Sequence, residues 1–216
     1  MNNQHIFIFS FFLMCTAAVH AQQPAVKDTA ALFQHIQMLK PVEATLDSIF
    51  DSNEFNLRQM DAVAQKYGSS SKQADSLWKK ICKTDGPRLA RVKQILAQYG
   101  WLGIDEVGEK ANAAIFMVIQ HADTTTQGTY LPIMEAAVKN GKAKPDDLAL
   151  LEDRVLCQRG KRQLYGSQVR QNKTGRYEFF PIADEANVDK RRASVGLEPL
   201  EQYARNFDID YHLPKQ

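Results

Sequence analysis

Apolar residues recur at three- and four-residue steps along most of this chain, and this spacing constrains the fold more than any other feature. Between Pro41 and Gly68 the recurring positions are Val42, Leu46, Ile49, Phe50, Leu57, Met60, Val63 and Tyr67. Such steps place side chains on one face of an α-helix, because the helix has about 3.6 residues per turn. The segment is therefore predicted to be one long amphipathic helix bracketed by Pro41 and Gly68.

The same spacing continues through most of the later segments. It predicts a helix from Ser71 to Tyr99 that Pro87 breaks or kinks, and a helix capped by Asp105 that carries His121 on its apolar side. Further helices are predicted over residues 124–138, 145–155, 184–192 and 199–207.

The pattern changes after Gly160. Two runs rich in aromatic and β-branched residues, 164–169 and 176–180, flank a polar loop at 171–175 and predict a β-hairpin. Two strands alone are marginally stable, so the hairpin must pack on the helices. The predicted fold class is mainly α, a single helical domain with a small β-hairpin near the C-terminal third.

Residues 1–21 have the pattern of a signal peptide. A polar start is followed by an apolar run at 6–14, and Val19 and Ala21 occupy the small-residue positions before Gln22. The apolar run is shorter than the roughly 20 residues that a membrane span needs. We therefore predict an exported bacterial protein, periplasmic or extracellular, with one domain at 22–216 and no membrane span once the signal is removed.

Cys15 raises a lipoprotein alternative, but Met14 before it is larger than the small residue that a lipoprotein signal requires. An uncleaved N-terminal anchor is the other alternative. Removal of the signal leaves Cys82 and Cys157, and an exported protein can oxidise such a pair. A bridge between them would contribute about 4 kcal/mol, whereas two buried thiols are the other possibility.

Charge and motifs exclude several classes of function. The net charge of +2 is almost neutral, and basic residues are spread over loop-like sequence, which argues against nucleic acid as a partner. His121 and Asp123 supply two metal ligands, fewer than a zinc site needs, so neither a metal nor a cofactor is predicted. Phosphate-binding glycine loops and the usual hydrolase motifs are absent.

Polar residues occupy several positions where apolar ones are expected. His121 and Arg154 lie on apolar helix faces, and Gln163, Tyr165 and Gln168 lie on or beside a predicted strand. One interpretation is a structural network that ties the hairpin to the helices, because buried polar groups must be paired. The other is a functional cleft.

In the cleft, His121 acts as general acid or base, and Asp153 or Asp123 fixes its tautomer. Arg154, with Arg191 or Arg192, holds an anionic group. Gln163 lines the cleft, and Tyr165 and Gln168 orient the substrate. Ser167 is a weak candidate nucleophile, because nothing in the sequence places it near His121.

A series of ordered short motifs carries a family resemblance. They are Gly100-Trp101, Gly108, Gln120-His121-Ala122, Leu131-Pro132, Leu151-Glu152-Asp153-Arg154, Gly160, Gln163, Tyr165-Gly166-Ser167-Gln168, Pro181-Ile182 and Val188-Asp189-Lys190-Arg191-Arg192-Ala193-Ser194-Val195-Gly196-Leu197. From about residue 60 to 203 the chain resembles the bacterial family called domain of unknown function 6624. Ser167 stands where that family often has Thr, which keeps the hydroxyl. The resemblance implies a helical fold with a small β element and no particular activity.

Three functions remain open from the sequence. The first is an exported enzyme, hydrolase-like, in which His121, Asp153 and Tyr165 are catalytic. The second is a non-catalytic binding domain that recognises a small anionic ligand, a peptide or an envelope component. The third is a scaffold in which the polar residues are architectural.

The signal-peptide pattern leads to a test. Because Val19 and Ala21 satisfy the small-residue rule, the mature chain is expected to begin at Gln22. N-terminal sequencing of the protein recovered from the envelope or the medium measures this. A mature chain that begins at a lipid-modified Cys15 would contradict the assignment.

Overall fold

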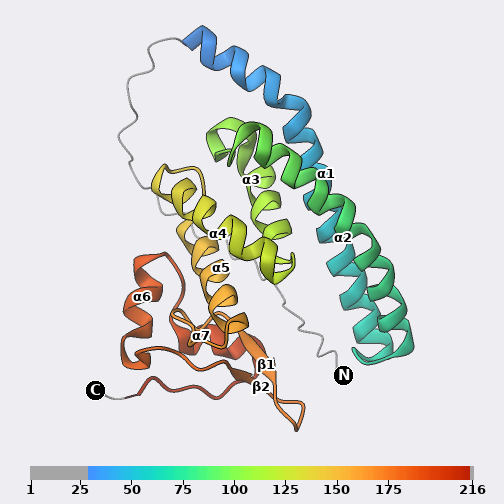
Figure 1. Ribbon diagram of the computed structural model, residues 1–216. Coiled ribbons are helices and arrows are strands. Elements are labelled where there is room, and N and C mark those ends of the chain that lie inside the picture. The colour runs from blue at the N-terminus through green and yellow to red at the C-terminus, as the bar shows by residue number, and fades with distance from the viewer. Residues whose placement is uncertain (1–28, 215–216) are drawn as a thin grey trace.

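The computed structural model describes residues 29–214, and the predicted signal peptide with its cleavage site lies outside this range. The elements are α1 (Thr29–Tyr67), α2 (Lys72–Tyr99), α3 (Ile104–Gln120), α4 (Thr124–Lys139), α5 (Pro145–Gln158), β1 (Val169–Gln171), β2 (Tyr177–Phe179), α6 (Val188–Ser194) and α7 (Leu200–Ala204). Short 3₁₀ turns precede α6 at Glu185–Asn187 and follow α7 at Arg205–Phe207. The mainly α fold with a two-stranded hairpin is confirmed (Figure 1).

Helix α1 begins earlier than predicted, and Pro41 lies inside it. Proline has no N–H to donate within a helix, which is why the sequence suggested a helix start there. Leu39 and Val42 on either side of the proline are both buried, so packing compensates for the missing bond. Figure 1 shows the helix bending along its N-terminal part.

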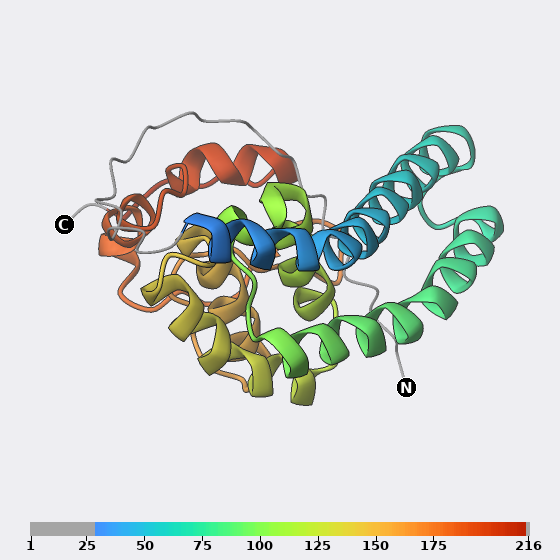
Figure 2. The same cartoon turned by 90° about the horizontal axis from the view of Figure 1, so that it is seen from above.

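Helix α2 also runs through its proline. Ser71 caps its N-terminus by accepting the N–H of Ala74 at 3.1 Å, as the sequence suggested. Pro87 does not end the helix, which instead curves gently along its length (Figure 2). Together α1 and α2 extend beyond the rest of the molecule on one side.

Two helix caps differ by one or two residues from the prediction. Helix α3 is capped at Gly103 and not at Asp105, because the carboxylate of Glu106 accepts the N–H of Gly103 at 2.7 Å. The spacing of Thr124 and Gln127 is that of a capping box, which predicts a cap at Thr124. Helix α4 is instead capped by Asp123, which accepts the N–H of Thr126 at 2.9 Å. In both helices, a hydrogen bond from a backbone N–H to a nearby carboxylate fixes the position of the cap.

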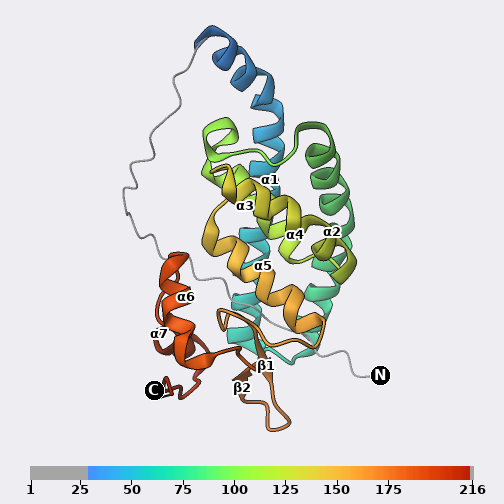
Figure 3. The ribbon, with the colours of Figure 1, turned by 60° about the vertical axis from the view of Figure 1, so that its left-hand side comes forward.

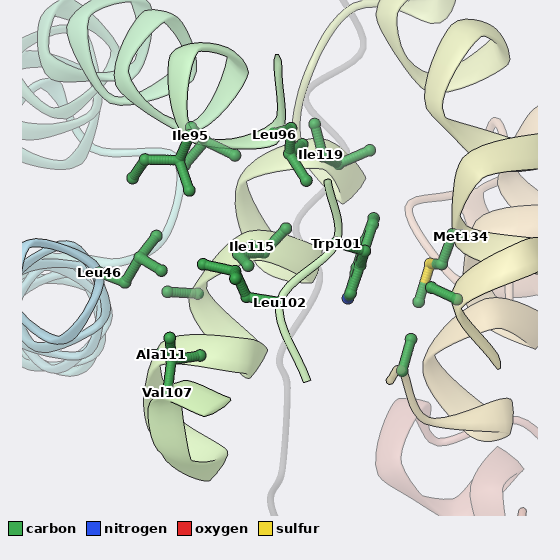
Figure 4. Packing of buried hydrophobic residues seen from close by; sticks show 14 of the residues in the cluster. Leu46, Ile95, Leu96, Trp101, Leu102, Val107, Ala111, Ile115, Ile119 and Met134 are labelled. Carbon is green, nitrogen blue, oxygen red and sulfur yellow. The ribbon is translucent and has the colours of Figure 1, made fainter. Parts of the chain in front are cut away.

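The main core lies where helices α1 to α4 meet. Figure 4 shows Leu46 of α1, Ile95 of α2, Ile115 of α3 and Met134 of α4 pointing toward one another around Trp101. All of these side chains are buried. The loop that carries Trp101 therefore lies inside the helical body and joins α2 to α3.

The C-terminal third forms a separate unit on the side of α5 that faces away from α1 and α2 (Figure 3). It has a small core of its own made by Ile182, Val188 and Leu200, with Phe179 and Tyr203 packed against it. In the hairpin, Val169 pairs with Phe179 in antiparallel register. The first strand is shorter than predicted, because the residues before Val169 bind other parts of the chain.

The two candidate bridge cysteines are free thiols in the described structure. Cys82 is exposed on α2, which packs on α1 and α3, whereas Cys157 is half-buried on α5, which packs on α4 and α3. Of the two alternatives from the sequence, the structure has free thiols and no bridge, and Cys82 is exposed where a buried thiol was considered. Burial raises the pKa of the Cys157 thiol to about 12.

A chain beginning at Gln22 is thus expected to show two titratable thiols without any reductant. Cys82 should react fast with a disulfide reagent and Cys157 slowly, because reactivity follows access and the thiolate fraction. Stopped-flow labelling measures both phases, and Cys82→Ser should remove only the fast one. If the thiols become titratable only after reduction, the protein contains the disulfide and the free-thiol assignment is wrong.

Candidate functional site

The last five residues of the connection between α5 and the hairpin, 164–168, contain the YG-x-Q motif, and we call them the motif loop. The carboxylate of Asp153, which is fully buried on α5, accepts four hydrogen bonds from backbone N–H groups of this loop. They come from Leu164 at 2.6 Å, from Tyr165 at 3.0 and 3.2 Å, and from Ser167 at 2.9 Å. Burial raises the pKa of Asp153, and these N–H groups oppose that rise.

Gln163 holds the end of the motif loop. Its amide oxygen accepts the N–H of Gln168 at 2.8 Å, and its amide nitrogen donates to the carbonyls of Gln168 and Phe180 at 3.0 and 2.8 Å. Its own backbone pairs with Pro181 and Ala183. The amide of Gln163 pairs with the backbone N–H and carbonyl of Gln168, which a neighbouring strand would otherwise do. The first strand therefore begins only at Val169.

Two arginines of α6 bind the carbonyls of the same loop. Arg191 donates through Nε to the carbonyl of Leu164 at 2.8 Å, and Arg192 donates through Nη1 to the carbonyl of Tyr165 at 2.7 Å. Arg192 is buried, also bonds the carbonyl of Glu198, and lies 4.9 Å from the centre of the Tyr203 ring. Both arginines therefore position the backbone.

The motif loop also packs tightly against the small C-terminal core. A Cβ atom added at Gly166 would lie 2.8 Å from Leu200 and 3.1 Å from Ile182, and the φ angle of Gly166 is +72°. Both facts restrict this position to glycine. The Tyr203 hydroxyl donates to the carbonyl of Ser167 at 3.0 Å.

Most of the predicted site residues thus form a network that supports one loop. Asp153, Gln163, Arg191 and Arg192 bind backbone groups, and the side-chain amide of Gln168 donates to the hydroxyl of Ser167 at 3.0 Å. Ser167 and Gln168 are both buried. This arrangement favours the structural interpretation for these residues.

Arg154 is different, because two of its nitrogens have no partner. Its Nε and Nη2 are buried and unpaired, and its side chain as a whole is half-buried on α5. Burial lowers the pKa of Arg154 to about 10, which leaves it charged at neutral pH. Among the predicted site residues that the structure describes, Arg154 is the one arginine with two buried guanidinium nitrogens that lack a partner.

His121 lies at the C-cap of α3 and is exposed, not on the buried face where the sequence placed it. Helix α3 ends at Gln120, so His121 does not continue the apolar face of that helix. Desolvation and the positive charge of Arg154 both lower its pKa below the ordinary 6.5. Because the residue keeps contact with water, screening weakens both effects, but their common direction gives a neutral imidazole at pH 7.

The structure does not join His121 to its proposed catalytic partners. Within residues 29–214 no hydrogen bond links His121 to a carboxylate, and both oxygens of Asp153 already accept N–H groups. Asp123 caps α4 and bonds Thr126. Tyr165 is hydrogen-bonded to Glu152, and desolvation with the charge of Glu152 raises the pKa of Tyr165 to about 12.

Two residues important for this region were not among the site residues predicted from the sequence. Tyr203 contacts both Ser167 and Arg192, and Glu152 is the partner of Tyr165. Tyr203 lies on a short helix far along the chain, so only the folded backbone brings it to the loop. Glu152 precedes Asp153 within a family-like motif, which was a usable signal.

We also searched the described residues for a metal-ligand group and for a surface groove that includes the predicted site residues. No group of three or more His, Cys, Asp or Glu side chains suited to a metal occurs in the part of the chain that the structure describes. A groove of about 720 Å³ lies between α1 and α2, bordered by Gln59, Val63, Lys72 and Leu77. It includes none of the predicted site residues.

Comparison with known proteins identifies the family. A model described as "Family of unknown function (DUF6624)" matches residues 57–215, and the chain therefore belongs to that family. No curated protein and no solved structure is detectably similar to the chain. No helix within residues 29–214 is long and apolar enough to cross a membrane.

The Asp153 network leads to a stability test. Asp153→Ala should lower the free energy of unfolding by about 3 kcal/mol or more, because three backbone donors lose their acceptor in a buried setting. Asp123→Ala, which removes an exposed helix cap, is the matched control and should cost clearly less than Asp153→Ala. Urea denaturation measures both. Equal losses in the two variants would contradict the network.

Proposed function

We propose that this member of the DUF6624 family is a non-catalytic binding domain that holds an anionic group at Arg154. The observation that carries the proposal is the pair of buried, unpaired nitrogens on its guanidinium. A charged group taken out of water without a partner costs stability, so an unpaired one indicates a site kept for a ligand.

The electrostatic surroundings of Arg154 support this. The groups that act on its charge are the Tyr203 phenol and the Cys157 thiol, and both stay protonated because their pKa values are raised to about 12. Neither group carries a negative charge at neutral pH. The positive charge of Arg154 is therefore available to a ligand.

The geometry favours binding over catalysis. A general base works best when its pKa is near the operating pH, and the pKa of His121 is shifted away from neutrality. The carboxylate that was to orient His121 supports the motif loop instead. The two groups that act on the charge of Arg154, the Tyr203 phenol and the Cys157 thiol, are neutral at pH 7, which suits recognition.

We also propose that the domain acts outside the cytoplasm, and that residues 22–216 form one domain. The signal-peptide pattern of residues 1–21 supports export. The Asp153 contacts support one domain, because they join the small C-terminal core to the helical body. The ligand would then be a small molecule or an envelope component.

Arg154→Met tests the binding site. The substitution keeps the aliphatic packing and removes an unpaired charge, so the melting temperature should rise by a few degrees. The stabilisation that saturating anions give to the wild type should disappear. Differential scanning calorimetry with and without small carboxylates, phosphate and sulfate measures both effects.

Arg176→Met is the control for net charge, because Arg176 is exposed in the hairpin loop. It should change neither the melting temperature nor the anion response. A wild type that no anion stabilises, together with an Arg154→Met variant that melts lower, would show that Arg154 is only structural.

His121 supplies a second test by NMR titration. Desolvation and Arg154 lower its pKa, so its imidazole should titrate below 6.5, and Arg154→Met should move the midpoint upward. A histidine with a lowered pKa stabilises the fold above pH 6.5 and loses this contribution as the pH falls through its folded pKa. An unchanged midpoint in the variant would contradict an effect of the Arg154 charge on the pKa of His121.

A further inference from the structure

We infer that the groove between α1 and α2 binds an amphipathic α-helix of another protein, one whose apolar stripe is flanked by acidic residues. This interaction is separate from the anion site proposed at Arg154 and does not depend on it. Three features of the helix pair support it: the course of the groove, the exposure of apolar side chains and the sign of the charges.

The groove follows the seam between α1 and α2 over several helical turns. Its distal part, near the turn that joins the two helices, has a volume of about 720 Å³ and contains Ala62 and Leu77. A second part of about 530 Å³ contains Ser48 and Arg88. Ser48 and Ala62 are fourteen residues apart and Leu77 and Arg88 eleven, which are close to four and three helical turns, so on each helix both parts share one face.

The length of the groove suits a helix of ordinary size. Along α1 it extends from residue 44 to residue 63, which is about 28 Å at a rise of 1.5 Å per residue. A partner helix of about 20 residues has the same length. Binding of an amphipathic helix in a groove is a common mode of recognition between proteins.

The distal ends of the two helices are poorly covered. In Figure 2 they extend away from the other helices. Among residues 51–86, all of which the structure describes, only Met60 and Ala74 are buried. Helices normally bury an apolar face against a neighbouring element, as in helical bundles. The helix pair therefore presents a face that a third helix can cover.

Phe55 adds a large apolar side chain to this face. It lies seven residues after Ser48 and seven before Ala62, about two turns in each direction, so it belongs to the face of α1 that borders both parts of the groove. It is 55% exposed. Aromatic side chains are frequent anchors of protein interfaces. A partner that offers only charge would leave this ring in water, whereas the apolar stripe of a helix covers it.

The charged residues that border the groove are all basic. They are Lys72 and Lys80 in the distal part and Arg88 and Arg91 in the other, and no carboxylate borders either part within the described residues. Arg88 lies 3.6 Å from Asp85, but the other three form no ion pair in this part of the chain. Acidic residues on both flanks of a partner helix would pair with these cations and steer its association.

The same charges disfavour a second copy of this chain as the occupant. Symmetric pairing of two copies would place the four cations of one groove against the four of the other, with no carboxylate between them. Like charges that face each other across an interface oppose association. The occupant is therefore a different protein.

Fluorescence anisotropy with labelled synthetic peptides tests the inference on the mature chain. The first peptide is a helix of about 20 residues with leucine along one face and glutamate on both flanks. The second has lysine in place of each glutamate, and the third has serine in place of each leucine. The first should bind more tightly than the other two by about tenfold or more. Added salt should weaken it, because salt screens exposed charges.

Two variants of the groove and two matched controls locate the site. Phe55→Ser should weaken binding of the first peptide by about tenfold. Phe33→Ser should not, although Phe33 is 63% exposed on the same helix. Lys80→Glu should weaken it by a similar factor, whereas Lys173→Glu makes the same change of charge in the exposed hairpin loop and should have little effect. All four side chains are exposed, so the melting temperature should stay that of the wild type.

Several results would overturn the inference. They are no binding of the first peptide, equal binding of the second or the third, and an equal loss of binding in Phe55→Ser and Phe33→Ser. A mature chain that sediments as a dimer, and that Phe55→Ser makes monomeric, would assign the groove to a second copy instead. Arg154→Met should leave peptide binding unchanged, so a failure here is distinguishable from a failure of the proposed function.

Discussion

The carboxylate of Asp153 is the interaction on which the C-terminal half of this fold depends. It is buried on α5 and accepts four backbone bonds from residues 164–167, which have no strand or helix to pair with. Buried backbone groups without partners are costly, so this one side chain replaces a secondary-structure element. The hairpin and the small aromatic core are held to the helical body through it.

The other motif residues complete the same arrangement from the opposite side. Arg191 and Arg192 bind the carbonyls of residues 164 and 165, Gln163 pairs with both backbone groups of residue 168, and Tyr203 binds the carbonyl of Ser167. Against this background of paired groups, the unpaired edge of Arg154 stands out. Among the described residues, most polar residues of the motifs support the loop, whereas Arg154 keeps two buried nitrogens without a partner.

The sequence was a good guide to the elements and to the existence of a polar network, but not to the roles within it. Apolar spacing predicted the helices, and α4 and α5 lie close to the predicted ranges 124–138 and 145–155. The predicted start of α1 at Pro41 was wrong, because burial of Leu39 and Val42 stabilises the helix by more than the hydrogen bond that proline cannot donate. His121 was misplaced because α3 ends one residue before it.

The sequence by itself determined the helical class, the hairpin and the set of polar residues, because periodicity and turn residues act locally along the chain. Only the tertiary structure decided that Asp153 serves the loop 164–167 and not His121, and that Arg154 keeps two nitrogens unpaired. These outcomes depend on which backbone groups meet a side chain across distant segments. Such meetings follow from the packing of α5 against the C-terminal unit, which no local pattern encodes.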